Sequence, residues 1–325
     1  MPSTKLHQKL LQPIHEFPFL EPVEAAGGQA LPCLVDVRNE DQIQKSIEDA
    51  VSKFGGIDIV INNASAINLT GTQETPMKKY DLMHQINTRG TYLLTKLALP
   101  YLKASKNNPH VLNISPPLNM NPRWFRDHVA YTMAKYGMSM CVLGMAEEFK
   151  SSHIAVNALW PKTAIITAAM EMLGGGGGVS AQCRTPEIMA DAAYVILTRD
   201  SKSFTGNFVI DEAILREEGC KDFGQYLAVP GTPEKDLIPD FFLDEVEDPS
   251  QVTDSAKGSS KARFVGGVDT AKATASSSEK PASGVKTVQG VFDKLGSLIN
   301  EELIQKVQAV YTFKVKGEYI KSLGV

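Results

Sequence analysis

The sequence lacks the features that would tie it to nucleic acid, a membrane or a metal. Its formal net charge is −4, so it has no basic excess to attract a phosphate backbone. No apolar run approaches the roughly 20 residues that cross a bilayer, and the opening residues lack the apolar core of a secretion signal. The cysteines form no Cys-x-x-Cys pair and have no histidine at ligand spacing, so we expect reduced intracellular thiols and no metal site. These cysteines are Cys33, Cys141, Cys183 and Cys220.

What the sequence does contain is a regular alternation of short apolar runs and amphipathic stretches. The apolar runs predict strands at 31–37, 57–61, 110–115, 154–159 and 207–211. Helical periodicity predicts helices at 40–54, 77–103, 127–150 and 186–197, and Asn39 is suited to cap the first of them. This alternation predicts an α/β fold, a doubly wound parallel sheet with helices on both faces. Ligands of such sheets bind at the carboxyl ends of the strands.

Tyr131 and Lys135 are the first candidates for chemistry, because they lie four residues apart on a predicted helix. That spacing places them one turn apart on the same face. A lysine ammonium near a phenol favours the phenolate and lowers the tyrosine pKa, which makes the hydroxyl usable for proton transfer near neutral pH. A pair at this spacing also occurs by chance on many helices, so the pair alone does not assign a function.

Polar residues follow several of the predicted strands. Asp36 ends the first strand, Asn62, Asn63 and Ala64 follow the second, and Ser115 ends the third. Each also has an ordinary structural explanation. An aspartate can cap the next helix, an Asn-Asn pair suits a turn, and a serine is common at a strand end. Pro161 and Thr163 follow the fourth strand, while Asn87 interrupts an apolar helical stretch where an amide is not favoured.

Taken in order, these residues resemble the short-chain dehydrogenase/reductase family from about residue 21 to 245. The resemblance implies a Rossmann-like sheet and an oxidoreductase that moves hydride to or from a nicotinamide ring. The residues that carry it are Asp36, Asn62-Asn63-Ala64, Asn87, Ser115, Tyr131-x-x-x-Lys135 and Asn157-x-x-x-Pro161.

The resemblance also implies roles for the catalytic group. Tyr131 would protonate a carbonyl oxygen or remove a hydroxyl proton. Lys135 would lower the Tyr131 pKa and bind the nicotinamide ribose, and Asn87 would hold a water that links Lys135 to solvent. Ser115 would hold the substrate oxygen, although it lies sixteen residues before Tyr131 where the family usually has thirteen, and Pro116 stands at the aligned position.

The cofactor implied by the resemblance is NADP or NAD, with NADP favoured. Asp36 would contact the adenine ring, and Asn63 with Ala64 would line the cofactor cleft. Pro161 and its successors would meet the nicotinamide end, where either Thr163 or Thr167 would contact the carboxamide.

One part of the family pattern has no match. The family holds the pyrophosphate with a Thr-Gly-x-x-x-Gly-x-Gly turn between its first strand and helix, and nothing before Asp36 resembles it. The pentaglycine run at 174–178 follows a helical stretch and is expected to be a flexible loop beside the substrate pocket. We therefore expect a chain truncated relative to the full-length protein, with weak dinucleotide binding. The 57–61 strand would keep an unpaired edge unless the 31–37 strand pairs there; otherwise the N-terminal region packs irregularly.

The composition divides the chain into further segments. Residues 1–20 are expected to be irregular, and 246–284, rich in Ser, Ala, Lys and Gly, to be a flexible linker. Residues 285–325 resemble the start of a sterol carrier protein 2 domain, an α+β lipid-binding module. The alternative for this last segment is an amphipathic hairpin without a function.

The sequence thus favours an oxidoreductase acting on a carbonyl or secondary alcohol of a lipid-like substrate. The alternative is an inactive truncated form that dimerises through the helices around Asn87 and Tyr131, or takes part in lipid binding and trafficking. Homodimers and a peroxisomal or mitochondrial location follow from the resemblance alone. The final residues, 321–325, are not a peroxisomal address.

Overall fold

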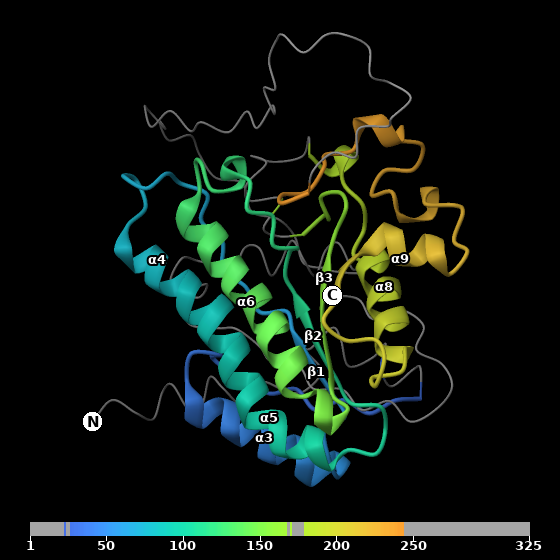
Figure 1. Ribbon diagram of the computed structural model, residues 1–325. Coiled ribbons are helices and arrows are strands. Elements are labelled where there is room, and N and C mark those ends of the chain that lie inside the picture. Colours follow the sequence, from blue (N-terminus) through green and yellow to red (C-terminus); the bar gives the residue numbers. More distant parts are fainter. Residues whose placement is uncertain (1–22, 24–26, 168–169, 171–178, 244–325) are drawn as a thin grey trace, which may run out of the picture.

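The computed structural model describes residue 23, residues 27–167, residue 170 and residues 179–243. Its centre is a sheet of parallel strands in the order β1-β2-β3-β4 (Figure 1). The strands are β1 (Ile59–Asn62), β2 (His110–Ile114), β3 (Ala155–Trp160) and β4 (Phe208–Ile210). The predicted α/β fold is confirmed, and the predicted strand positions shift by one or two residues at their ends.

Helices cover both faces of the sheet. In Figure 1 one group lies on the left of the strands and the other on the right. The left group comprises α3 (Glu40–Phe54), α4 (Met77–Met83), α5 (Thr91–Ala104) and α6 (Val129–Glu148). The right group comprises α8 (Glu187–Thr198) and α9 (Asp211–Glu217). No helix among the described residues is long and apolar enough to cross a membrane.

Neighbouring residues of the central strands are buried in opposite layers. Val111 and Val156 pack into the core beneath α3, α5 and α6. Leu112 and Leu159 pack into the core beneath α8 and α9. All four side chains are 0–1% exposed, which explains why these strands read as continuous apolar runs in the sequence.

Helix α3 has the predicted bounds, because both of its ends carry strong local signals. The Asn39 side-chain oxygen accepts a hydrogen bond from the Gln42 amide at 3.1 Å. At the other end, Gly55 adopts φ +84°, a left-handed conformation that glycine reaches without steric cost.

The predicted helix 77–103 is continuous but not uniform. Between α4 and α5 the chain forms a π-helix, His84–Gly90, a wider form that is common at functional sites. Here the Thr88 hydroxyl donates to the Ala134 carbonyl of α6 at 3.0 Å. The two helices can come this close because residue 137 of α6 is a glycine. A Cβ at this position would lie 2.3 Å from the Thr88 hydroxyl oxygen. The π-helix therefore packs directly against the helix that carries Tyr131.

The predicted strand 31–37 was wrong. These residues have no strand pairing, and their backbone polar groups bind side chains instead. The Asp36 amide donates to Gln42 Oε1 at 2.7 Å, and the preceding Ala30 carbonyl accepts from Lys53 Nζ at 2.7 Å. Val35 and Val37, each 3% exposed, anchor the segment in the core. Among the described residues β1 pairs only with β2, which agrees with the irregular packing considered for this region.

Several sequence expectations fall on residues that the structure does not describe. They are the irregular region 1–20, the glycine run 174–178, the linker 246–284 and the lipid-binding module 285–325.

Candidate active site

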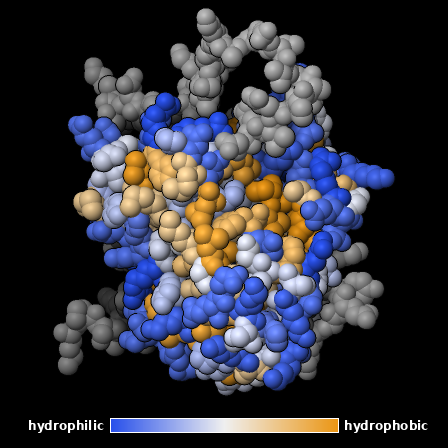
Figure 2. Space-filling view, viewed as in Figure 1, coloured by the Kyte–Doolittle hydropathy of each residue, from blue (hydrophilic) through white to orange (hydrophobic). Residues whose placement is uncertain are grey.

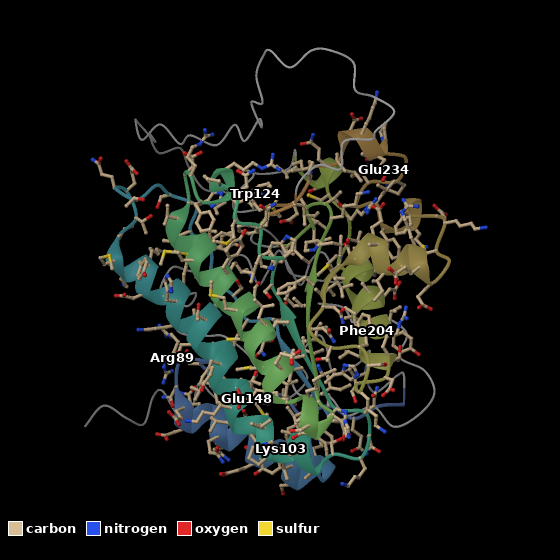
Figure 3. The ribbon with its side chains drawn as sticks, viewed as in Figure 1. Arg89, Lys103, Trp124, Glu148, Phe204 and Glu234 are labelled. Carbon is tan, nitrogen blue, oxygen red and sulfur yellow. The ribbon has the colours of Figure 1, made fainter. Side chains whose placement is uncertain are left out.

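Tyr131 lies in the first turn of α6, beside the carboxyl ends of the strands. It is 5% exposed and belongs to an aromatic cluster whose centre is Phe242. The Tyr131 and Phe242 ring centroids are 6.2 Å apart. Figure 3 labels Trp124 of the same cluster, at the end of the molecule where α6 begins. The tyrosine ring is therefore largely buried among aromatic neighbours.

Lys135 lies one turn further along α6 and is 4% exposed. Its ammonium donates to the Ile114 carbonyl at the end of β2, over 3.0 Å, and sits 5.2 Å from the centroid of the Trp160 ring. Burial lowers the Lys135 pKa to about 8, against a smaller opposing effect of the Asp240 carboxylate. A lysine in this state can change its charge within the physiological range.

The expectation that Lys135 lowers the Tyr131 pKa is not met in this arrangement. Burial raises the Tyr131 pKa above its ordinary value, and the nearby Asp240 carboxylate raises it further. The reason is that the phenolate would be desolvated, while the Lys135 ammonium is directed to the Ile114 carbonyl. Tyr131 is consequently a protonated phenol at neutral pH, suited to donate a proton.

Asn87 is fully buried in the π-helix, and its amide is paired with the backbone of a single residue. The Asn87 oxygen accepts from the Ala66 amide at 2.7 Å, and its nitrogen donates to the Ala66 carbonyl at 3.0 Å. These two bonds fix the segment that follows β1, in which Asn63 is exposed and Ala64 half-buried. The observed function of the Asn87 side chain is thus to hold the loop at the end of β1.

Two buried hydroxyls that follow the adjacent strands β2 and β3 make no hydrogen bond to any described residue. One is Ser115, which is 0% exposed just after β2, and the other is Thr163, which is 7% exposed just after β3. An unbonded buried hydroxyl carries a desolvation cost that a ligand would remove. Thr167 differs, because it is exposed and its hydroxyl accepts from the Met170 amide at 3.3 Å. Both free hydroxyls fit a nicotinamide carboxamide or a substrate oxygen.

Asp36 is engaged by its neighbour Arg38 rather than free. Arg38 Nε lies 2.9 and 3.0 Å from the two Asp36 carboxylate oxygens, and a second guanidinium nitrogen lies at 2.5 Å. Burial would raise the Asp36 pKa, but these hydrogen bonds lower it below its ordinary value. Asp36 is thus a charged carboxylate at neutral pH, with its charge paired at the turn before α3.

Other buried polar residues near the strand ends have structural roles. Asn62 donates to Asn113 at 2.8 Å and to Thr95 at 3.1 Å, linking β1, β2 and α5. Asn157 accepts the Asn207 amide at 3.0 Å and so ties β3 to the start of β4. Pro161, at the end of that motif, is buried.

Sequence reasoning missed the segment that closes the site, residues 237–243, which we call the C-terminal strap. It runs antiparallel beside 162–164: the Asp240 amide donates to the Lys162 carbonyl at 3.0 Å, and the Ala164 amide to the Ile238 carbonyl at 2.8 Å. The Trp160 indole donates to the Phe241 carbonyl at 2.9 Å. The only sign of this strap in the sequence was the aromatic pair Phe241-Phe242, which stands just before the composition changes.

The strap places an aromatic side chain against the site. Phe242 is 0% exposed, and its ring contacts those of Trp124, His128, Tyr131, Tyr136 and Trp160. Trp124 and Phe125 pack against the same cluster.

A buried ion cluster holds the start of α9 beside the strap. Glu212, 2% exposed, accepts from Arg184 at 2.5 Å, from Lys162 at 2.7 Å and from Arg216 at 2.7 Å. Asp211 accepts the Lys162 amide at 2.9 Å, and burial raises its pKa to about 6. The segment after β3 is therefore fixed from both sides.

Comparison with known proteins identifies close relatives. The family model described as short chain dehydrogenase matches residues 18–173. Hydroxysteroid dehydrogenase-like protein 2 of Xenopus tropicalis is 58% identical over 296 residues, which cover 91% of this chain and 67% of that protein. The protein of the same name from Homo sapiens is 55% identical over 313 residues, covering 96% of this chain and 70% of that protein. The chain thus spans about two thirds of the length of these relatives.

Two crystal structures share the fold. A short chain dehydrogenase of Mycobacterium thermoresistibile is 44% identical with a TM-score of 0.64, over 71% of this chain and 80% of that one. A candidate dehydrogenase of Xanthomonas campestris is 47% identical with a TM-score of 0.66, over 70% of this chain and 81% of that one.

Proposed function

The chain belongs to the short-chain dehydrogenase family, and we propose that it is an NAD(P)-dependent oxidoreductase acting on a carbonyl or secondary alcohol of a lipid-like substrate. The observation that carries this proposal is the grouping of Tyr131 and Lys135 with two unbonded buried hydroxyls at the ends of adjacent strands. A bound nicotinamide supplies or accepts the hydride.

In reduction, Tyr131 donates its proton to the oxygen of the substrate carbonyl. The phenol is protonated at neutral pH, which is the state required of a general acid, and it gives up its proton as the carbonyl oxygen gains negative charge. Ser115 is the hydroxyl placed to hold that oxygen, because its own hydrogen-bonding capacity is otherwise unused. In oxidation Tyr131 would remove the hydroxyl proton as a phenolate, a form that burial of the ring disfavours in this arrangement.

Lys135 supports this step by its charge. In this proposal the Lys135 ammonium binds the nicotinamide ribose and, on turning from the Ile114 carbonyl towards the phenol, stabilises the phenolate that remains after proton transfer. Asn87 contributes by holding the loop after β1 in position. A water bound to Asn87 would use the second N–H or the second lone pair of its side-chain amide, which the bonds to Ala66 leave available. Tyr131, Lys135, Ser115 and Asn87 thus form the proposed catalytic group.

The residues that would hold the dinucleotide lie along the strand ends. Thr163 is better placed than Thr167 for the carboxamide, because its buried hydroxyl is unbonded while the Thr167 hydroxyl accepts the Met170 amide. Pro161 borders the same end, Asn63 and Ala64 would line the middle of the cleft, and Asp36 the adenine end. NADP is the favoured form, by resemblance to the family.

We expect the affinity for the dinucleotide to be weak. In related enzymes the pyrophosphate rests on backbone amides of a glycine-rich turn, and no such turn precedes Asp36 in this chain. Weak binding would appear as a high KM for the cofactor together with a measurable kcat.

The substrate class follows from the lining of the site. Trp124, Phe125 and Phe242 belong to the apolar cluster that contains Tyr131, so an apolar chain or ring of a substrate would gain by leaving water there. A lipid-like ketone or secondary alcohol is the substrate type that this lining favours.

The test is NADPH consumption by the full chain with a panel of ketosteroids and straight-chain ketones, at NADPH concentrations up to the millimolar range. Tyr131→Phe should lower kcat at least about 100-fold, the lower limit of a general-acid contribution. The matched control is Tyr194→Phe, a half-exposed tyrosine on α8, which should leave kcat unchanged. A folded wild-type chain with no turnover would favour the alternative of an inactive partner protein.

A homodimer is proposed from the surface of α5 and α6. Large apolar side chains are exposed there, notably Tyr92 at 55%, Met140 at 56% and Leu143 at 50%. Figure 2 shows an apolar band across the face where α6 lies. The family commonly associates through these helices, so a second copy of the chain is the proposed partner. Leu143→Glu should shift the chain to monomers in sedimentation velocity, whereas Val229→Glu, at an exposed position outside the band, should not.

A further inference from the structure

We propose that Phe242 of the C-terminal strap is a specificity-determining residue whose ring occupies the place of the substrate beside Tyr131. A substrate has to displace this ring before its carbonyl oxygen can reach the Tyr131 hydroxyl. The inference rests on the proposed function of Tyr131 and deepens it, because it names the group with which a lipid-like substrate competes.

The Tyr131 side chain is covered in this structure. It is 5% exposed, and its ring centroid lies 6.2 Å from that of Phe242, which is fully buried. A proton can pass to a substrate oxygen only when that oxygen comes within about 3 Å of the phenol oxygen. The carbon chain of a ketone cannot come so close to a side chain that is buried to this extent. One of the aromatic neighbours of Tyr131 must therefore move for the proposed reaction to occur.

Phe242 differs from the ring of Trp160 beside it in the backbone that carries it. Trp160 belongs to β3, which pairs with a strand on each side. Side chains hold the end of the strap. The Trp160 indole donates to the Phe241 carbonyl at 2.9 Å, and the Arg123 guanidinium donates to the Leu243 carbonyl at 3.3 Å. Release of these two bonds lets the end of the strap move without opening a helix or a strand.

The backbone of Phe242 is strained while its ring is in place. Its φ is +72°, in the left-handed region, where the Cβ of an L-residue comes too close to its own backbone. A bulky side chain keeps this conformation only when its packing enforces it, so the strain is released when the ring leaves. The other described non-glycine residues with positive φ are of the types that reach this region most readily, Asn108, Asp127 and His153.

The same arrangement leaves polar atoms of the site without partners. The Trp124 indole nitrogen and the Ser115 hydroxyl are buried and make no hydrogen bond to any described residue. Desolvated groups of this kind favour the exchange of an apolar ring for a ligand that carries an oxygen. A lipid-like ketone has both parts that are needed: its chain replaces the Phe242 ring in the cluster, and its oxygen accepts a hydrogen bond.

The test uses the two tryptophans of the chain, Trp124 and Trp160, whose ring centroids lie 5.9 and 5.8 Å from that of Phe242. The full chain is labelled with ¹⁵N-tryptophan, its indole N–H signals are recorded by NMR, and Trp124→Phe assigns them. The ligand is 2-decanone, and no cofactor is added. In the wild-type chain the Trp160 indole signal should move upfield, because displacement of the strap breaks its hydrogen bond to the Phe241 carbonyl.

Phe242→Ala should bind 2-decanone at least about 10-fold more tightly than wild type. The wild-type affinity is reduced by the fraction of molecules whose strap is open, typically one in ten or fewer for a minor state, and the variant lacks this reduction. For 2-butanone, whose chain is too short to fill the place of the ring, the gain should be smaller. Phe204→Ala, a partly buried phenylalanine in the core layer beneath α8, is the control and should leave the affinity unchanged.

Phe242→Leu covers the case in which Phe242→Ala does not fold, and it should give a smaller gain in the same direction. Equal or weaker binding by the folded variant would contradict the proposal. So would a wild-type complex in which the Trp160 indole signal does not move, or the absence of binding to both chains.

None of these readings uses turnover. A chain that binds 2-decanone in this way but reduces no ketone keeps this inference and fails only the proposed function. Where turnover is measurable, Phe242→Ala should lower the KM for 2-decanone, and an unchanged KM would contradict the proposal.

Discussion

Replacing Lys135 by methionine should make the protein more stable and less active. The charged lysine is 4% exposed, and burial holds its pKa at about 8, whereas the unfolded chain has the ordinary value of about 10.4. At about 1.4 kcal/mol for each pH unit, the charged form costs the native state on the order of 3 kcal/mol. The lost hydrogen bond to the Ile114 carbonyl offsets part of this, about 1 to 2 kcal/mol. The expected net gain at pH 7 is about 1 to 2 kcal/mol.

The pH dependence identifies the cause. The unfolded chain binds the lysine proton more tightly than the native state, so native stability rises as pH increases from about 8 towards 10. Methionine has no such dependence, and the advantage of Lys135→Met should therefore shrink over this interval. Urea unfolding at pH 7, 8.5 and 9.5 measures it, with Lys103→Met at an exposed position of α5 as the control. An advantage that is absent at pH 7, or that is constant across pH, would refute the reasoning.

Three further outcomes are expected. Phe242→Ala should lower the free energy of unfolding by about 3 to 5 kcal/mol, because the side chain is 0% exposed at the centre of the aromatic cluster; exposed Val229→Ala is the control in urea unfolding. Asn87→Ala should cost about 2 to 4 kcal/mol in the same assay, because it leaves the half-buried amide and carbonyl of Ala66 without their partner, and no loss would contradict the observed pairing. Burial would raise the Glu212 pKa, but hydrogen bonds from neighbouring cations lower it to about 2. On the order of 2 kcal/mol of stability should therefore disappear as pH falls from 4.5 to 2. Glu212→Gln should flatten this part of the plot of unfolding free energy against pH.

The parts of the fold that the sequence predicted well are those fixed by local signals. Helix α3 has its predicted bounds because Asn39 and Gly55 act at its two ends without help from distant residues. The order of strands and helices followed from the apolar runs, since strands buried on both faces have few polar residues. The 31–37 segment shows the limit of this reasoning. Val35 and Val37 are buried, but a strand also needs a neighbouring strand, and pairing depends on the whole sheet.

The sequence predicted which residues belong to the candidate site better than it predicted how they are arranged. The sequence order of Asn87, Ser115, Tyr131 and Lys135 pointed to the right family. The direction of the Tyr131 pKa could not be read from spacing, because it depends on how deeply the ring is buried and on a carboxylate that lies 109 residues further along the chain. Asp240 carries no motif and reaches the site only through the path of the C-terminal strap.

The most direct test of the account follows one hydrogen. The full chain is incubated with a lipid-like ketone and NADPH that carries deuterium at the transferable position of C4, and the alcohol product is examined by mass spectrometry. We predict that the alcohol carries deuterium at the former carbonyl carbon, that millimolar cofactor is needed, and that Tyr131→Phe forms at least about 100-fold less of it. No deuterated alcohol from the folded wild-type chain at any cofactor concentration, or an equal yield from Tyr131→Phe, would contradict the central claim.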